Sequence, residues 1–458
     1  MRFALSLLLV LAALPASGQI VVVNQGEASV GDGSLTLIPE FPQSGTEAVH
    51  LFGGQLGSTL QSATEAGDDL YLVSSSADRI DIVDLDTDTR VGQIASGLSS
   101  PRYLALLNAF DPSKAYVSNH VAGGSSYVVA VDLSARTVGT AIEVDGLPET
   151  IAVQFLGGGR GKAYVALGAS AANRDGVDSL AVLDAEADTL LRYVDIGCSA
   201  RFVRETLGTE VVAFCEDTDE AVVIDAEADT VKQRLAFGEE IGDPFGVGQS
   251  VGPGSRPIAV RRPSSFEHYV ITASGIAVVE PIDRDTYGIV RTIPIPEADT
   301  RSISAVALSP GGNLLVLGRP DSDNPFSADG TITIHNADDG ALRATYPAGV
   351  YPSHIVLDEQ HPLAETAGSE VGGFRLTLAG ANPARHHTAV DLVLDRPASV
   401  RVDLFDGLGR RVQTVATGDH AAGTHRLRLG VEGLAPGTYV VRAVSDSRVT
   451  SRPLTVVR

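Results

Sequence analysis

Residues Val128–Ile142 read VVAVDLSARTVGTAI, and the interpretation of the first 357 residues rests on this pattern. An apolar segment leads into Asp132, a short polar turn follows, and Thr137 opens a second segment in which apolar and small residues alternate. A period of two is typical of a β-strand with one buried face. The stretch therefore predicts two antiparallel strands joined by a tight turn.

The same phrase recurs along the chain, with copies that begin at Ile80, Leu180, Ala221, Ile276 and Ile332. Each copy follows an apolar segment such as KAYVSNH, and most are preceded by a further one such as PRYLALL. The anchoring residues lie 48, 52, 41, 55 and 55 residues apart, and they are Asp84, Asp132, Asp184, Asp225, Glu280 and His335. Repeats of this length predict propeller blades of four antiparallel strands.

The repeated Asp is interpreted as a structural residue. Its carboxylate can accept hydrogen bonds from backbone amides two residues further on, which fixes a tight turn. A metal-binding role is the alternative, and the turn geometry favours the structural one.

The two ends of this region complement each other. Ile20–Asn24, Ser34–Ile38 and Glu47–Leu51 resemble the last three strands of a blade, whereas Tyr351–Leu357 resembles a first strand with no blade after it. Pairing the two ends would remove both exposed sheet edges. The sequence therefore predicts an all-β, seven-bladed β-propeller over residues 19–357, closed by its N-terminal and C-terminal strands.

The repeats also resemble a known family. YVSNH (Tyr116–His120), with SPRYLAL before it and VVAVDLSARTV after it, is similar to the YVTN-type propeller repeats of bacterial and archaeal surface proteins. The resemblance implies a seven-bladed ring that resides outside the cytoplasm. Members of this family do not share one activity, so the resemblance implies no particular function.

A second module is predicted after a linker. Residues 358–373 are polar and lack periodicity, which is typical of a linker. From Phe374 to Arg458, seven short alternating segments follow, and this pattern predicts a small immunoglobulin-like β-sandwich.

This module resembles the C-terminal sorting domain of type IX secretion substrates. The resemblance rests on Asn382-Pro383, VDLFDGLGRRV (Val402–Val412), AGTHRLRL (Ala422–Leu429), GLAPGTYVVRA (Gly433–Ala443) and the closing SRPLTVVR. Ala381 departs from the aromatic or Pro that many members have before Asn-Pro. The resemblance implies the type IX machinery as a partner and delivery to the outer cell surface. An adhesive module that stays with the protein is the alternative.

The N-terminus predicts export. Residues 1–18 carry Arg2, an apolar run from Ala4 to Leu14, and small residues at Ala16-Ser17-Gly18, as a cleavable signal peptide does. The run is too short to cross a bilayer, which needs about 20 residues. We therefore expect a secreted or surface-located protein without a transmembrane segment.

Charge is distributed unevenly along the chain. The whole protein has a formal charge of -23, but residues 374–458 carry 12 arginines, no lysine and 7 acidic residues, a charge of +5. The preceding residues therefore carry −28. So acidic a region repels nucleic acid, which excludes that class of partner. It is interpreted as a solvated acidic surface, and attraction of cations or basic partners is the alternative.

Two cysteines, Cys198 and Cys215, flank a predicted hairpin formed by Ala200–Glu205 and Glu210–Phe214. In an exported chain this placement favours a disulfide over two buried thiols.

Candidate ligand-binding residues lie where first strands begin or where the two middle strands connect, because these positions surround the mouth of a propeller channel. They are Asn24, Arg102, Asn119, His120, Glu149, Arg201, Arg256, Arg319 and His354. Solvated side chains in a wet channel are the alternative interpretation.

Two function classes follow from these observations. The first is an exported binding or scaffold propeller with a protein or glycan ligand. The second is a propeller enzyme of the lactonase or metal-dependent hydrolase type. The sequence has no His-Glu-x-x-His, P-loop or Gly-x-Ser-x-Gly motif and no Trp, so no catalytic residue, metal site or cofactor is predicted.

Overall fold

The computed structural model describes residues 20–357 and 374–457, apart from the segments 39–47, 53–54, 68, 86, 108–112, 122–124, 157–160, 169–177, 207, 243–258, 262–266, 284–285, 296–302, 310–311, 381–383, 395, 406–410, 435–436 and 446–447. Within the described residues the fold is all-β, with one short 3-10 helix, η1 (Ser75–Ala77). No helix in that part of the chain is long and apolar enough to cross a membrane. The predicted signal peptide, the linker and Arg256 fall outside it.

Before residue 358 the strands form antiparallel sheets of four, and most sheets use four strands that follow one another in the sequence. The first three such sheets are β4 (Leu60–Ala66), β5 (Asp69–Ser74), β6 (Arg79–Asp84) and β7 (Thr89–Ile94); β8 (Pro101–Leu106), β9 (Lys114–Asn119), β10 (Tyr127–Asp132) and β11 (Thr137–Glu143); and β12 (Leu147–Phe155), β13 (Gly161–Gly168), β14 (Ser179–Asp184) and β15 (Thr189–Asp195). The next three are β16 (Ala200–Glu205), β17 (Glu210–Cys215), β18 (Glu220–Asp225) and β19 (Thr230–Ala236); β20 (Ala259–Arg261), β21 (His268–Thr272), β22 (Gly275–Pro281) and β23 (Tyr287–Ile293); and β24 (Ala305–Leu308), β25 (Leu314–Arg319), β26 (Asp329–Asn336) and β27 (Leu342–Val350).

One further sheet joins the two ends of this region. Its order is β28 (Pro352–Leu357), β1 (Ile20–Asn24), β2 (Ser34–Ile38) and β3 (Val49–Leu51). In the pairing of β1 with β28, Val22 lies opposite Ile355 and Ile20 lies opposite Leu357. The predicted pairing of the two ends is therefore present.

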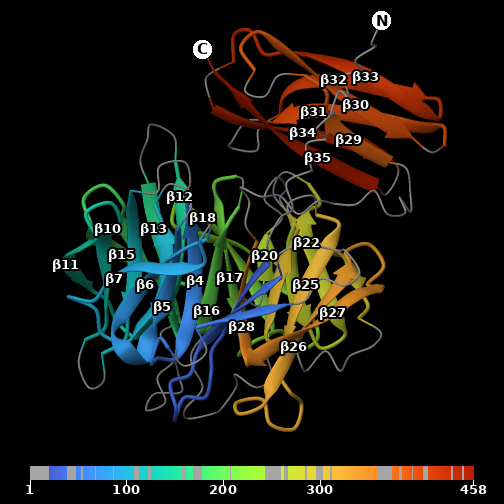
Figure 1. Cartoon of the computed structure of the whole chain (residues 1–458). Coiled ribbons are helices and arrows are strands. Elements are labelled where there is room, and N and C mark those ends of the chain that lie inside the picture. Colours follow the sequence, from blue (N-terminus) through green and yellow to red (C-terminus); the bar gives the residue numbers. More distant parts are fainter. Residues whose placement is uncertain are drawn as a thin grey trace, which may run out of the picture.

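Hydrophobic clusters lie between successive sheets. Val73 and Ile82 of one sheet pack with Val117 and Val129 of the next, and similar clusters link each sheet to its successor. Ile20 and Val22 pack against the sheet of β24–β27, whereas Val21 and Val23 pack against that of β4–β7. The packing therefore returns to its starting point, which is a propeller-like arrangement, and Figure 1 shows the sheets from the side.

Innermost strands of adjacent sheets run in the same direction. The Ser62 hydroxyl of β4 donates to the Arg102 carbonyl of β8, and two residues later the Thr64 hydroxyl donates to the Leu104 carbonyl, both at 2.8 Å. The region thus has two faces. We call the one where innermost strands begin the entry face, and the one where they and the third strands end the turn face.

The repeated Asp holds the turns of the turn face, as predicted. The Asp184 carboxylate accepts hydrogen bonds from the amides of Glu186 and Ala187, each at 2.9 Å, and Asp84, Asp132 and Asp225 act in the same way. In the sixth copy this role belongs to Asn336, whose Oδ1 accepts from the Asp338 amide at 2.8 Å. The anchor predicted at His335 is therefore wrong by one position, because His335 itself is buried and bonds the Gly340 carbonyl.

The C-terminal residues form two separate sheets, drawn in red in Figure 1. One has the order β29 (Phe374–Leu378), β30 (His387–Leu394) and β33 (Gly423–Gly430). The other has the order β32 (Arg411–His420), β31 (Ala398–Phe405), β34 (Gly437–Ser445) and β35 (Arg448–Val456). A buried cluster that includes Leu392, Val402 and Val441 joins the two sheets, and all seven predicted strands are present.

Candidate functional site

Three of the predicted site residues lie at equivalent positions on the entry face. Arg102, Glu149 and Arg201 stand near the beginnings of β8, β12 and β16, the innermost strands of three successive sheets. His120 follows the end of β9 on the same face, because β9 runs antiparallel to β8. The sequence repeat therefore brings together four residues that are up to 99 positions apart.

These four residues form what we call the Glu149 cluster. The Arg102 Nε lies 3.4 Å from Glu149 Oε2, and both side chains are almost fully buried. The His120 Nε2 lies 3.6 Å from Glu149 Oε1 and 3.1 Å from the Pro148 carbonyl oxygen. One buried carboxylate thus faces a guanidinium and an imidazole from the preceding sheet.

Arg201 completes the cluster from the following sheet. A Cβ placed on Gly168 would lie 3.4 Å from the Glu149 Cγ and 3.2 Å from the Arg201 Cγ, so the two side chains flank this glycine together. The Thr150 hydroxyl also donates to the Arg201 carbonyl at 3.0 Å, which fixes β16 against β12. Arg201 is only half-buried and faces the solvent more than Arg102 does.

The electrostatics of the cluster are set by burial and by two cations. Burial lowers the pKa of His120, and the guanidinium groups of Arg102 and Arg201 lower this pKa further. Glu149 and a hydrogen bond with the Pro148 carbonyl raise the pKa of His120, but by less than burial and the two guanidinium groups lower it. His120 is therefore neutral at pH 7, and a single carboxylate stands against two guanidinium charges.

The remaining predicted residues do not join this cluster. The Asn119 amide is used locally, since its Oδ1 accepts from the Ser99 amide and its Nδ2 donates to the Val117 carbonyl, each at 3.0 Å. Asn24 is fully buried and donates to the hydroxyls of Ser34 and Thr36. Both asparagines therefore hold their own sheets together.

Arg319 and His354 lie in buried surroundings elsewhere. The Arg319 Nε donates to the Thr333 hydroxyl at 2.7 Å, and burial lowers its pKa to about 10. His354 lies on β28, and burial, followed by the charge of Arg204, lowers its pKa to about 3. A hydrogen bond with the backbone of Ala63 opposes this shift. His354 thus interacts with residues of both β4 and β16.

A second set of polar contacts was not predicted from the sequence. The Lys114 Nζ and the Tyr116 hydroxyl both lie 2.6 Å from Asp188 Oδ1 in the next sheet. In the following pair of sheets, Lys162 and Tyr164 contact Asp229 in the same way, at 2.7 and 2.5 Å. The signal was visible as the tripeptide Lys-Ala-Tyr at 114–116 and 162–164, together with the repeated DAEAD at 184–188 and 225–229.

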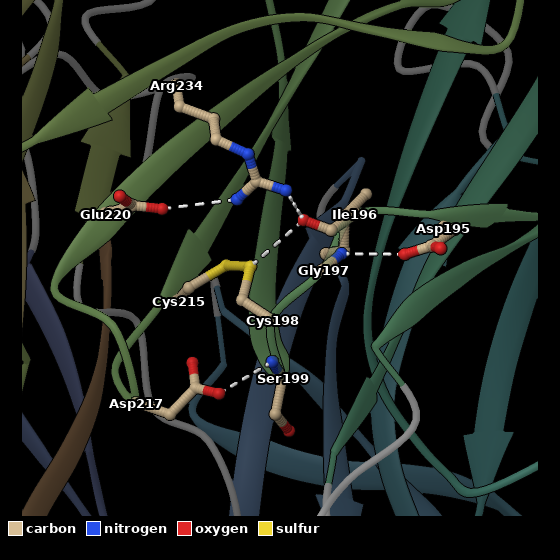
Figure 2. The surroundings of a disulfide bond; sticks show 9 residues. All are labelled: Asp195, Ile196, Gly197, Cys198, Ser199, Cys215, Asp217, Glu220 and Arg234. Atoms are coloured by element: carbon tan, nitrogen blue, oxygen red, sulfur yellow. Dashed lines mark hydrogen bonds and ion pairs between the residues drawn. A yellow bond between two sulfur atoms is a disulfide. The ribbon is translucent and has the colours of Figure 1, made fainter.

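The two cysteines are joined by a disulfide, shown in Figure 2. Cys198 precedes β16 and Cys215 ends β17, so the bond ties the beginning of an innermost strand to its neighbour. Close by, the Ser199 amide donates to Asp217 Oδ2 at 3.0 Å, and Arg234 pairs with Glu220 at 3.2 Å. Both cysteine side chains are buried.

Metal-ligand geometry occurs at one place among the described residues, where Cys198, Cys215 and Asp217 lie close together. The disulfide uses both sulfur atoms there, and a metal ligand must be a thiolate. Asp321 and Asp323 lie at alternate positions just after β25. The Asp321 Oδ1 accepts hydrogen bonds from the amides of Asp323 and Asn324 and so holds its own turn. Among the predicted site residues that the structure describes, those of the Glu149 cluster bring a carboxylate, guanidinium groups and an imidazole together on one face.

Fold and site together define an all-β, propeller-like protein with a charged cluster on one face. No family model matches the chain. No curated protein matches it either.

Solved structures with similar folds exist. A functionally unknown protein from Desulfotomaculum acetoxidans is 13% identical, with a TM-score of 0.53, and the match covers 74% of this chain and 98% of that one. Hydrazine synthase from Kuenenia stuttgartiensis is 17% identical, with a TM-score of 0.49, over 64% of this chain and 88% of that one. The β-propeller domain of Cps50 (Swd1) from Myceliophteria thermophila is 12% identical, with a TM-score of 0.46, over 63% and 86%. At such identities the likeness concerns the fold alone.

Proposed function

We propose that this chain is an exported binding protein in which a seven-bladed β-propeller of the YVTN type carries a ligand site on its entry face. A C-terminal immunoglobulin-like module delivers the protein to the cell surface through the type IX machinery. The ligand is an extracellular glycan or protein that presents polar groups.

The seven-bladed ring is supported by the sheet order and by the packing. Six sheets of consecutive strands and one sheet built from both ends are linked in sequence by hydrophobic clusters. Joining the ends in one sheet leaves no open edge between the first and last blades. The sandwich is supported by two antiparallel sheets that share one core.

The binding role rests mainly on the Glu149 cluster. Its carboxylate lies 3.4 Å from the Arg102 guanidinium and 3.6 Å from the His120 imidazole, and Arg201 of the following sheet lies beside it, so its position is fixed before a ligand arrives. Fixing polar groups in advance reduces the entropy that binding must overcome. Half-buried Arg201 and partly exposed His120 offer hydrogen-bond donors and an acceptor to the solvent on this face.

Binding is tested on panels of immobilised glycans and extracellular proteins. Wild-type protein and Arg201→Gln are compared with Arg343→Gln, a matched change at an exposed arginine of β27. We expect the wild type and Arg343→Gln to bind the same ligand and Arg201→Gln to bind it at least about tenfold more weakly. Equal binding by all three proteins would place the ligand site elsewhere.

Delivery is tested by deleting residues 374–458. We expect the truncated protein to accumulate inside the cell envelope, whereas the full chain reaches the surface, as measured by surface labelling of intact cells. Surface delivery at the normal level without this module would contradict the sorting role and leave the adhesive alternative. The hydrolase alternative stays a prediction from the sequence, and no contact of the described residues favours it.

A further inference from the structure

The turn face carries a dense set of carboxylates. The third strands β6, β10, β14, β18 and β22 all end there, and each ends in or just after an acidic residue: Asp84, Asp132, Asp184, Asp225 and Glu280. Several turns add further acids, such as Glu186 and Glu227, which are exposed. Because the repeat places one such turn in each sheet, this face has a high density of negative charge.

The chain leaves the propeller region on this same face. β28 is the innermost strand of its sheet and runs in the same direction as the innermost strands of the adjacent sheets. Its last residue, Leu357, therefore lies on the face where the third strands end. Phe374, the first residue of the C-terminal module, follows after 16 residues. The covalent connection therefore keeps the module within reach of the turn face.

The charges of the two parts are complementary. The C-terminal module has a net charge of +5, supplied by arginine, and the rest of the chain has −28. Opposite net charges attract over distances of about a Debye length, roughly 10 Å at 0.1 M salt. Such attraction orients a tethered module before any contact forms.

One ion pair between the two parts is present. Arg442 Nη2 lies 3.9 Å from Glu280 Oε2, and the side chains are only 24% and 17% exposed. Arg442 lies on β34 between Val441 and Ala443, which point into the sandwich core, so its own side chain points outward. An outward arginine is normally well exposed, yet its Nε has no solvent access. Figure 1 shows the red module next to the end of the propeller region that carries the β22 label.

We propose that the turn face is the docking surface for the outer face of the sheet β32-β31-β34-β35, with the Arg442–Glu280 pair at the contact. The interface is held by charge, so it weakens as salt rises. Docking there leaves the entry face and its Glu149 cluster open to solvent. This inference does not depend on the ligand or on the route of export.

Small-angle scattering of the full chain tests the interface. The radius of gyration is measured in about 0.05 M and about 1 M salt, where the Debye length falls to about 3 Å. We expect a compact wild type in low salt and a larger radius in high salt. Arg442→Glu should have the larger radius in both conditions, and the exchange Glu280→Arg with Arg442→Glu should restore the compact form in low salt.

The control is Arg428→Glu, the same charge change at an exposed arginine of β33 in the other sheet of the module. It should keep the wild-type radius, and thermal melting checks that every variant is folded. If Arg442→Glu does not fold, Glu280→Arg alone replaces it. The proposal is overturned if the wild-type radius does not change with salt and equals that of Arg442→Glu or Glu280→Arg. It is also overturned if Arg428→Glu expands the protein as much as Arg442→Glu does.

Discussion

His354 is an example of a residue whose charge state is set by its surroundings. Its side chain lies between β28 and β4, its Nδ1 is fully enclosed, and its pKa is lowered to about 3 by burial and by Arg204. In the unfolded chain the same imidazole titrates near 6.5. Between these two values the unfolded state binds more protons than the folded state, so folding stability falls as the pH drops.

We therefore predict that His354→Gln reduces the acid sensitivity of the fold. At pH 4.5 the histidine should cost the wild type about 3 kcal/mol relative to pH 7.5. Urea denaturation of both proteins at the two pH values measures this difference, and carboxylate titration contributes equally to both. If the wild type and His354→Gln lose the same free energy of unfolding between pH 7.5 and pH 4.5, His354 is not held neutral in the fold.

Asp229 is the acceptor in one of the two repeated Lys-Tyr-Asp contacts. Its carboxylate accepts from the Lys162 ammonium and the Tyr164 hydroxyl of the preceding sheet, and its backbone has a positive φ of 55°. Removing it takes the charged acceptor away from both donors in a largely buried place and leaves them only the Ala226 carbonyl.

Asp229→Ala should therefore lower the free energy of unfolding by about 2 kcal/mol. Glu227→Ala, which removes an exposed acid two residues earlier, is the control and should have little effect. Chemical denaturation checks both variants. A similar small effect of the two changes would mean that the buried contact contributes no more than a surface charge.

At the level of elements, hydroxyl groups connect the innermost strands of adjacent sheets. The Thr150 hydroxyl of β12 donates to the Arg201 carbonyl at 3.0 Å and accepts from the Val203 amide at 2.8 Å. Ser62 and Ser304 make comparable bonds to Arg102 and Pro352. A single side chain thus satisfies two backbone groups of the adjacent strand.

Replacing Thr150 with Val keeps its shape but removes both hydrogen bonds. We expect Thr150→Val to destabilise the protein by about 2 kcal/mol, because a buried amide and a buried carbonyl lose their partner. Thr150→Ser should retain most of the stability, since it keeps the hydroxyl. Thermal unfolding compares the three proteins, and a Val variant as stable as the Ser variant would show that water replaces the hydroxyl.

The elements were largely predictable from the sequence, and the contacts between them were not. Strands such as Ile20–Asn24 and Glu220–Asp225 are short apolar runs that are buried on both faces, so their positions follow closely from the sequence. The anchor of the sixth repeat was misplaced by one residue because His335 and Asn336 are both polar. The structure identifies Asn336 as the residue that holds this turn, because Asn336 lies opposite Leu314 at the end of the β25–β26 pair and accepts from the Asp338 amide.

For the whole molecule, closure depends on β1. This strand lies between β2 and β28 and contributes Ile20 and Val22 to one intersheet cluster and Val21 and Val23 to another. Its removal exposes the edges of two strands and opens two clusters at once. Exposed edges of this kind pair with other chains.

We predict that a chain beginning at Gln25 loses cooperative unfolding and aggregates, whereas a chain beginning at Ile20 behaves like the full protein. Size-exclusion chromatography and calorimetry distinguish these outcomes. A monomeric Gln25 variant with an unchanged melting transition would mean that the ring does not depend on closure by β1.

The repeat, most strand positions, the structural Asp turns and the pairing of the two ends can be predicted from the sequence, because each follows from a local pattern or from a match between distant segments. Which polar residues meet depends on the folded chain. Arg102, His120 and Glu149 come together, whereas Asn119 bonds within its own surroundings. The physical reason is that a repeat determines how far along its strand a side chain lies. Packing between neighbouring sheets determines which way the side chain points and which residues it contacts.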